Sequence, residues 1–298
     1  MKIIGEKTLL EAALGIIKRS CTRIAPDAME LLKRSYSSEK NSAAKKLLEA
    51  MIRNAELAME TGKPVCQSPG YPVVYATLGG DIKLKADIRR VFQIAIIKST
   101  KMGYLRPSIV HPITRINHGN NLGQGMPDIE IEYNPQANYV DFIISFKGCG
   151  AELSNVLKCL TPAQVGKNAQ GIKKLVLESV VQAGGIPCPP VALGVGIGGQ
   201  IHYAAKLSRK AVSIRKWTDR NPDDELAALE EELLKLVNSL GIGPAGIGGN
   251  TTALTVKIEM AYTHTAICPV ALNFHCWTAR RSGVRIYSDG SVEYLFEK

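Results

Sequence analysis

Aromatic residues are scarce in this sequence: Phe, Trp and Tyr make up 6% of its 298 residues. Proteins that hold single-stranded nucleic acid stack its bases on aromatic side chains, so few stacking platforms are present. The net charge of +10 would by itself favour a polyanionic partner. However, the basic residues are spread along helical segments such as 83–90 and 206–216 rather than gathered in one run. We expect no nucleic-acid partner, and a positive field suits a small anionic substrate.

Long hydrophobic runs are also missing. No apolar run comes near the length of about 18 residues that a membrane-spanning helix needs. The N-terminus lacks the apolar core and the cleavage site of a signal peptide. We therefore expect a cytoplasmic protein with no membrane partner.

The cysteine pattern excludes two common kinds of site. No Cys-x-x-Cys pair occurs, which disfavours the usual zinc knuckle. The count is odd, and a chain of this size can build its core without disulfides. Metal or redox chemistry, or plain burial, is therefore expected for these residues. They are Cys21, Cys66, Cys149, Cys159, Cys188, Cys268 and Cys276.

Apolar spacing and turn residues predict a mixed α/β (α+β) fold in a single domain over residues 1–298. A helical lead-in is expected over 1–61, followed by an α/β core over 62–298. The expected helices are 8–19, 26–35, 38–61, 84–102, 161–183 and 222–240. The expected strands include 73–78, 129–133, 139–146, 251–259 and 267–274. The strands 129–133 and 139–146 are expected to pair with each other, and a final hairpin turns at 288–291.

Cys188 lies between prolines, which restrict its backbone, and a strand-length apolar run follows it. Gly194, Gly196 and Gly199 then match G-x-G-x-x-G, with Asp219 twenty residues further on, as in a dinucleotide site. The alternative is a cysteine ligand beside a glycine-lined anion pocket. The dinucleotide hypothesis is disfavoured because its glycine turn normally follows the first strand of a βαβ unit.

Three cysteines share one setting: Cys66, Cys188 and Cys276 each lie on a loop with proline, glycine or polar neighbours. Three thiolates can hold three irons of a cubane cluster and leave the fourth iron open. Spacing alone does not decide between this site and simple burial. Packing is the default expectation for Cys21, Cys159 and Cys268, and Cys149 is ambiguous.

Several stretches, in order along nearly the whole chain, resemble the iron–sulfur hydro-lyase family of class I fumarases and L(+)-tartrate dehydratase alpha subunits. Among them, Cys188-Pro189-Pro190 and Leu240-Gly241-Ile242-Gly243-Pro244 are the most specific. The stretches are 62–67, 105–108, 147–152, 188–199, 240–254 and 269–281. The resemblance implies a mixed-sheet domain whose glycine-rich loops converge on a [4Fe–4S] cluster.

The resemblance also implies a reaction and a ligand set. The cluster would be held by Cys66, Cys188 and Cys276, and its open iron would act as a Lewis acid. The reaction would be the reversible hydration of a hydroxy-dicarboxylate of the fumarate/malate or tartrate type.

The substrate contacts implied by the resemblance are Gln67, Arg106, Gly148, Cys149 and His264. Arg106 and His264 are the candidate catalytic residues, because a guanidinium can grip a carboxylate through two hydrogen bonds and an imidazole can bind the other end. The simpler alternatives are that Arg106 pairs with an acidic side chain and that His264 is a core histidine.

The family's larger members carry a second region, which two-chain enzymes supply as a beta subunit. We therefore expect an alpha-type chain with a separate beta subunit, assembled as a homodimer of alpha chains or as an α2β2 complex. A small dicarboxylate is the expected substrate.

The chain departs from the family pattern at Ser68, Pro69, His118, Asn120 and Cys149. Several of these changes remove negative charge, which would suit a more anionic substrate. Two alternatives to a standard hydratase therefore stay open: a paralogue with another substrate or chemistry, and a cluster-binding scaffold without turnover.

Overall fold

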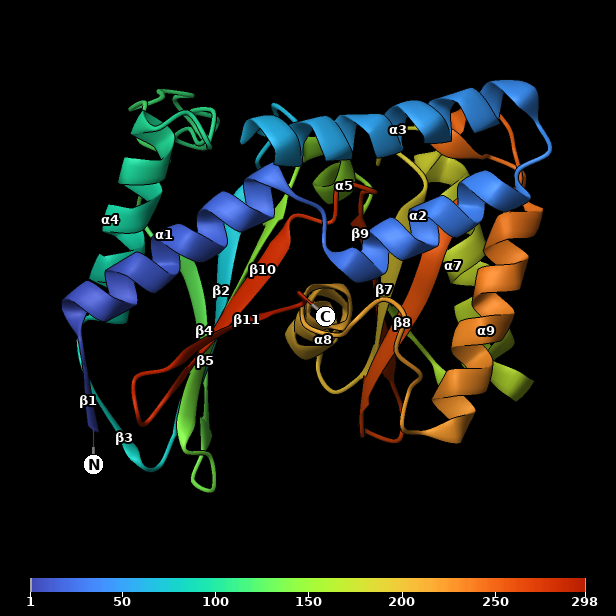
Figure 1. Cartoon of the computed structure of the whole chain (residues 1–298). Helices are drawn as coiled ribbons and strands as arrows, with labels where there is room; N and C mark the ends of the chain where they lie inside the picture. The colour runs from blue at the N-terminus through green and yellow to red at the C-terminus, as the bar shows by residue number, and fades with distance from the viewer. Residues whose placement is uncertain (1, 298) are drawn as a thin grey trace. The chain divides into compact units, whose positions relative to one another are not determined.

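The computed structural model (Figure 1) describes residues 2–297 of the chain, with side chains from Ile3 onward. It divides into two compact units. Unit 1 takes the residues up to 26, residues 54–148 and the residues from 278 onward. Unit 2 takes residues 27–53 and 149–277. Both units mix helices with a mixed sheet, which confirms the predicted α/β class.

Unit 1 is built on a five-stranded sheet with the order β11-β10-β5-β2-β4. Its strands are β2 (Tyr71–Gly79), β4 (Asp128–Asn134), β5 (Tyr139–Lys147), β10 (Arg281–Tyr287) and β11 (Val292–Leu295). A short parallel pair, β1 (Lys2–Gly5) with β3 (Ile82–Lys85), completes its strands. The described helices of this unit are α1 (Glu6–Thr22), α4 (Ile88–Lys101) and the end of α3 (Ser42–Thr61).

The predicted pairing of 129–133 with 139–146 is wrong, because β2 lies between β4 and β5. β2 pairs in parallel with β4 and antiparallel with β5. The difference in burial between β2 and β4 explains this order. Most of β2 is buried, whereas β4 is largely exposed or half-buried and forms the edge.

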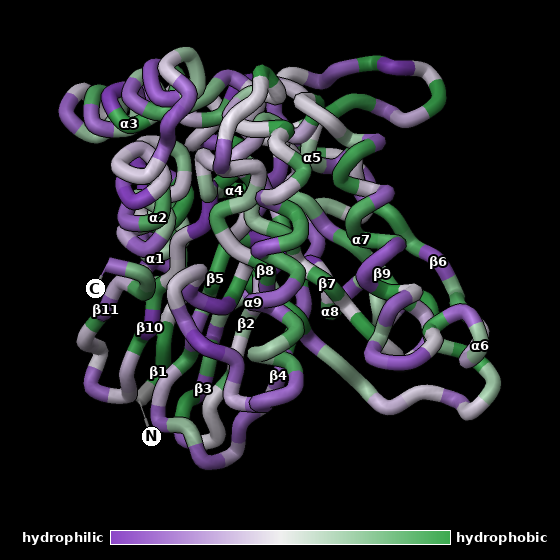
Figure 2. The backbone as a smooth tube through the Cα atoms, turned by 90° about the vertical axis from the view of Figure 1, so that its right-hand side faces the viewer, coloured by the Kyte–Doolittle hydropathy of each residue, from purple (hydrophilic) through white to green (hydrophobic). Residues whose placement is uncertain are grey.

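Helices α1 and α4 pack on the sheet of unit 1 and close its core (Figure 1). Phe92 of α4 and Phe142 of β5 lie with their ring centroids 5.7 Å apart. In Figure 2, hydrophobic colour runs along the inner strands β2 and β5 of this sheet. This core fixes the end of β5, which Gly148 directly follows.

Unit 2 has a four-stranded sheet with the order β6-β9-β7-β8. Its strands are β6 (Val156–Leu160), β7 (Val191–Gly198), β8 (Ala253–Ala261) and β9 (Cys268–His275). The odd-numbered residues of β7 pack in one core with α7 (Gln170–Ala183) and α9 (Asp224–Ser239). On the other side, Gly194 and Gly196 face α8 (Ile201–Ser213). The remaining helical segments are α2 (Pro26–Ser38), the start of α3, α5 (Cys149–Leu153), α6 (Pro162–Val165), η1 (Lys167–Ala169) and η2 (Pro244–Gly246).

Helix boundaries differ from the predicted ones where a capping residue or a glycine intervenes. Helix α3 begins at Ser42 rather than at 38, because the Asn41 side chain accepts hydrogen bonds from the first-turn N–H groups of Ala43 and Ala44. The predicted helix 161–183 is interrupted at Gly166, whose φ is +68°. Thr161 forms a capping box at its start.

Strand β6 was not predicted. Cys159 lies on it and is exposed, so its expected packing role is wrong. The final hairpin, β10 with β11, is confirmed. Within residues 2–297, no helix is long and apolar enough to cross a membrane.

Candidate functional site

The Cys66 loop of unit 1 is tied to its surroundings by backbone hydrogen bonds. The Val65 N–H group donates to the Cys21 carbonyl at 2.9 Å, and the Val65 carbonyl accepts from Asn54 Nδ2 at 3.0 Å. The Ser68 N–H group donates to Cys66 Sγ at 3.4 Å. The Cys66 thiol is half-buried and is in no disulfide.

Two glycines bring this loop against the end of β5. Gly70 has a φ of +82°, and a Cβ atom there would overlap the carbonyl group of Lys147. A Cβ atom on Gly148 would lie 3.1 Å from both Ser68 Oγ and Arg280 Nη2. The Cys66 loop, Gly148 and the residue before β10 therefore meet at one end of the five-stranded sheet.

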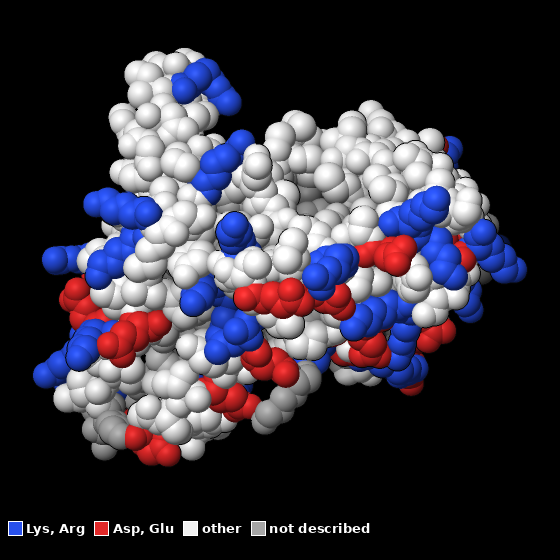
Figure 3. Space-filling model, turned by 45° about the horizontal axis from the view of Figure 1, so that its top comes forward, with Lys and Arg blue, Asp and Glu red and all other residues white. Residues whose placement is uncertain are grey.

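Arg106 lies on the irregular segment 103–127, which follows α4. The only formally charged residues of this segment are Arg106 and Arg115, and both are cations. The segment projects at the upper left of Figure 3, where its surface is white apart from blue side chains. Arg106 is exposed, and no ion pair involves it among residues 2–297. The alternative in which Arg106 pairs with an acidic side chain is therefore wrong.

Asn121 holds the two ends of this segment together. Its side-chain amide donates to the Arg106 carbonyl at 3.1 Å and accepts from the Ser108 N–H group at 2.8 Å. A cavity of about 590 Å³ lies between this segment and Tyr71 of β2, with His111 and His118 among its lining residues. His118, one of the departures from the family pattern, thus lines this cavity together with the start of β2.

In unit 2, Cys188 is held in an exposed turn before β7. Its φ is +57°, in the left-handed region that non-glycine residues rarely adopt. Its N–H group donates to the Gly185 carbonyl at 3.1 Å, and the carbonyl of the next residue, Pro189, accepts from Ala245 at 2.8 Å. The second glycine-rich loop therefore supports the turn, and the thiol itself is exposed.

The glycines of β7 serve helix packing. A Cβ atom on Gly194 or Gly196 would overlap the carbonyl group of Ser208 or Ala204 on α8. Asp219 is not available to a ribose either, because it accepts hydrogen bonds from Arg215 at 2.7 Å and from Lys257 at 2.8 Å. The dinucleotide hypothesis has no support in this geometry.

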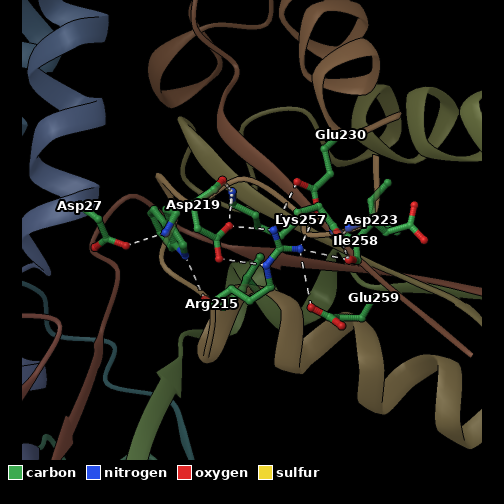
Figure 4. Close-up of polar contacts among 11 residues, drawn as sticks. Asp27, Arg215, Asp219, Asp223, Glu230, Lys257, Ile258 and Glu259 are labelled. Atoms are coloured by element: carbon green, nitrogen blue, oxygen red, sulfur yellow. Dashed lines mark hydrogen bonds and ion pairs between the residues drawn. The ribbon is translucent and has the colours of Figure 1, made fainter. Parts of the chain in front are cut away.

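Asp219 belongs to a polar network (Figure 4) that links the segment after α8 to α9 and β8. Arg215 Nη1 donates to Glu230 Oε1 at 2.7 Å, and the Ile258 N–H group donates to the same oxygen at 2.7 Å. Although burial raises the pKa of Asp219, its hydrogen bonds from Arg215 and Lys257 hold that pKa below its ordinary value. Burial raises the pKa of the neighbouring Glu259 carboxyl, a shift that Arg215 partly offsets. The network is a structural element of unit 2.

Cys276 directly follows β9 and is 8% exposed. The preceding residue, His275, is fully buried, and its ring packs edge-on against Trp217 with centroids 5.6 Å apart. The Trp217 N–H group in turn donates to Asp27 at 2.6 Å. The backbone that carries Cys276 is therefore fixed by a packed aromatic pair.

His264 lies on the exposed connection between β8 and β9, so the core-histidine alternative is wrong. Its Nδ1 atom accepts a hydrogen bond from the Ala266 N–H group at 3.2 Å, which leaves Nε2 as the outward atom. Cys149 is the exposed first residue of α5. The core histidine is His275, which the sequence analysis did not single out.

The cysteines differ in how well they suit a cluster. Cys66, Cys188 and Cys276 lie on loops and are in no disulfide, and thiols are the donors of iron–sulfur sites. Burial raises the pKa of Cys21 to about 11, and burial also raises the pKa of Cys268, so both favour the neutral thiol. Cys66 belongs to unit 1, and the other two candidate ligands belong to unit 2. Within residues 2–297, no three His, Cys, Asp or Glu side chains are grouped to hold a single metal ion.

Comparison with known proteins assigns the family. The family model described as fumarate hydratase (Fumerase) matches residues 10–285. The chain belongs to the fumarate hydratase family. It is 39% identical over 285 residues to a Methanocaldococcus jannaschii protein named, provisionally, L(+)-tartrate dehydratase subunit alpha. That match covers 95% of this chain and 99% of the relative.

Two Escherichia coli relatives of this family member, from strains UTI89 and K12, are named L(+)-tartrate dehydratase subunit alpha. Each is 31% identical to it over 287 residues, which cover 96% of this chain and 93% of the relative. The similarity therefore extends over nearly the whole of both chains.

Proposed function

We propose that this chain is the alpha subunit of a hydro-lyase that adds or removes water at a hydroxy-dicarboxylate of the fumarate/malate or tartrate type. The observation that carries the proposal is the family match over residues 10–285. The positive net charge and the acid-free segment around Arg106 support a dianionic substrate.

Cys66, Cys188 and Cys276 are the proposed ligands of a [4Fe–4S] cluster. Support comes from their thiols, which are in no disulfide, and from the backbone hydrogen bonds that hold the loops of Cys66 and Cys188. When bound, such a cluster supplies a Lewis-acidic iron for the hydroxyl group that leaves or enters. Cys21 is excluded as a fourth ligand, because it is buried among apolar side chains of the unit 1 core.

Arg106 is proposed to bind one carboxylate of the substrate. Its guanidinium is exposed and unpaired, so the two parallel N–H groups that match a carboxylate are available. The Gln67 side chain is exposed on the Cys66 loop and can donate an amide hydrogen to the same class of ligand. Gly148, the next proposed substrate contact, lies directly beside Ser68.

His264 is proposed to act at the opposite end of the substrate as a hydrogen-bonding or proton-carrying group. The hydrogen bond from Ala266 to Nδ1 fixes the ring, so that Nε2 would carry the proton in the neutral form. Cys149 is proposed as a neighbouring contact at the start of α5. The neutral Ser68 side chain cannot supply a carboxylate for acid–base chemistry on the Cys66 loop.

The chain is proposed to work with a separate beta subunit, as a dimer of alpha chains or an α2β2 complex. The support is that the relatives carry the name "subunit alpha" and that the match covers 93–99% of their length. A cytoplasmic location is proposed on the same similarity.

The test is anaerobic reconstitution of the full chain with iron and sulfide, alone and with a candidate beta chain. The Cys66→Ser, Cys188→Ser and Cys276→Ser variants should each lose cluster absorbance, whereas Cys159→Ser, an exposed cysteine on β6, should retain it. Malate, fumarate and tartrate are then assayed for turnover. Wild-type chain that takes up no iron and sulfide would refute the proposal.

A further inference from the structure

The cavity beside segment 103–127 is larger than a four-carbon dicarboxylate needs. Its volume is about 590 Å³. Clefts of about 300–1,000 Å³ typically bury a drug-sized ligand, and malate or tartrate is much smaller than such a ligand. The lining residues come from 108–126 and from Tyr71 at the start of β2, so the cavity lies within unit 1. It therefore has room for further atoms of a ligand.

Apolar side chains form much of the wall of this cavity. They are Ile109, Val110, Pro112, Ile116, Leu122 and Met126. Ile109, Val110 and Leu122 are half-buried, so this hydrocarbon wall is already partly shielded from water. Contact with an apolar group would remove the rest of it from water, which is favourable in proportion to the area that is covered. The wall thus suits a hydrocarbon group better than hydroxyl groups.

The polar groups of the cavity disfavour a cationic ligand. Among the described residues, no Asp or Glu lines it, and the charged residues of segment 103–127 are Arg106 and Arg115. His111 lines the cavity, and its Nδ1 atom accepts a hydrogen bond from the Thr114 N–H group at 3.1 Å. Nε2 therefore carries the proton of the neutral ring and is a donor. A neutral or anionic ligand fits these groups.

Ser108 adds an unsatisfied hydroxyl group to the wall. Its Oγ atom is buried and has no hydrogen-bond partner within residues 2–297. Buried polar atoms in proteins are nearly always hydrogen-bonded. A polar atom of a ligand in this cavity could therefore form a hydrogen bond that the described residues leave unmade.

The cavity wall is fixed to α4. Asn121 Nδ2 donates to Thr100 Oγ1 at 3.0 Å, and Gln93 Nε2 donates to the Met126 carbonyl at 2.9 Å. Within the segment, the His111 N–H group donates to the Ile116 carbonyl at 2.8 Å. A binding site that is held in this way loses little freedom when a ligand enters.

The backbone of Arg106 lies close to this cavity. Arg106 precedes the lining residue Ser108 by two positions, which separates their Cα atoms by at most about 7 Å. The Asn121 side chain bonds to both, at the Arg106 carbonyl and at the Ser108 N–H group. A ligand whose carboxylate is bound by Arg106 can therefore reach the cavity with a side group of a few carbons.

We propose that this cavity binds an apolar side group of the substrate. The substrate is then a malate-type dicarboxylate with a hydrocarbon substituent of several carbons, rather than malate or tartrate itself. This inference rests on the proposed dicarboxylate function and on the proposed role of Arg106. The wall that includes Ile116 would select the substituent, and Arg106 would bind the carboxylate.

The experiment compares two unreactive dicarboxylates, succinate and butylsuccinate. Their dissociation constants are measured by calorimetry on the full chain, before and after anaerobic reconstitution with iron and sulfide. Burial of the butyl group should make butylsuccinate bind about tenfold to hundredfold more tightly than succinate. Equal dissociation constants for the two compounds would overturn the proposal.

Two isoleucines of the same segment give a matched pair of variants. Ile116 lines the cavity and is 56% exposed, so Ile116→Asn should fold normally and weaken butylsuccinate binding about threefold to tenfold. Its succinate affinity should stay at the wild-type value. Ile113 is 85% exposed and does not line the cavity, so Ile113→Asn should bind both compounds within about twofold of wild type. An unchanged preference in Ile116→Asn, or an equal loss in Ile113→Asn, would overturn the proposal.

Other occupants of the cavity give different results. Hexanoate, a monocarboxylate, that binds as tightly as butylsuccinate would overturn the assignment of the cavity to a dicarboxylate substrate. A candidate beta chain that displaces butylsuccinate but not succinate would identify the cavity as a protein contact and refute the ligand site.

Iron and sulfide content, measured on the same samples, separates this inference from the proposed function. A chain that prefers butylsuccinate but takes up no iron and sulfide would refute the proposed cluster and leave the cavity assignment standing. A chain that holds the cluster and hydrates fumarate, yet binds succinate and butylsuccinate equally, would refute the cavity assignment alone.

Discussion

Removal of the Glu230 charge should destabilise unit 2 strongly. Glu230 is 6% exposed, and its Oε1 atom accepts hydrogen bonds from Arg215, Asn221 and the Ile258 N–H group at 2.7–2.9 Å. Glu230→Gln keeps the size of the side chain but replaces one carboxylate oxygen by an amide donor. Arg215 then loses a buried counter-ion and keeps Asp219 (Figure 4).

The expected cost follows from that geometry. Removal of one partner of a buried ion pair lowers the free energy of unfolding by about 3–5 kcal/mol. Because Arg215 keeps its pair with Asp219, we expect a loss of about 3 kcal/mol here. The assay is urea unfolding followed by circular dichroism. The matched control is Lys174→Gln, which removes an exposed charge from α7 and should change the free energy of unfolding by less than about 0.5 kcal/mol.

A double variant separates the pair from its surroundings. The double variant Arg215→Leu/Glu230→Leu should lose less free energy of unfolding than the two single variants lose together. Each single variant leaves the other member of the pair buried without this partner, whereas the double variant removes both charges. Additive losses, or a Glu230→Gln loss below about 1 kcal/mol, would refute the view of this network as a structural element.

Three further predictions concern residues with assigned roles. Gly196→Ala should lower the free energy of unfolding by about 1–3 kcal/mol, because its Cβ atom would overlap α8. Gly123→Ala, with open space around it, should be neutral or slightly stabilising. Equal effects of the two variants would contradict the packing role of Gly196. Asp219 has a lowered pKa when folded, so its stabilisation should be present above about pH 4 and be lost as the pH falls through that lower pKa. Asp219→Asn should reduce this loss of unfolding free energy at acid pH. An unchanged loss at acid pH would contradict the assignment. Arg106→Gln should weaken dicarboxylate binding about tenfold or more without a change in melting temperature, since Arg106 is exposed; a folding defect with normal affinity would contradict its binding role.

Local sequence patterns predicted most elements but not how the strands pair. Apolar spacing and turn residues located the helices of both units and the final β10–β11 hairpin. The position of β2 between β4 and β5 could not be read from the chain, because parallel pairing of β2 with β4 joins residues more than fifty positions apart. Strand β6 was not predicted because it is an edge strand with mostly exposed residues, so its sequence does not alternate between apolar and polar residues.

The candidate site was predicted unevenly for a similar reason. The loops that carry Cys66 and Cys188 were recognisable, because proline and glycine around a cysteine form a local signal. The burial of Arg280 had no such signal, because it depends on contacts with Gly148 and other segments that are distant in the sequence. Two adjacent arginines in a sequence usually indicate an exposed surface, and here both are buried.

The most direct test of the central claim is the iron and sulfide content of the anaerobically purified or reconstituted chain. About four irons and four sulfides per chain are expected for a cubane cluster. Substitution of Cys66, Cys188 or Cys276 by serine should abolish this content, and Cys159→Ser should preserve it. A wild-type chain without iron and sulfide, or a triple Cys66/Cys188/Cys276→Ser variant that still holds them, would contradict the assignment.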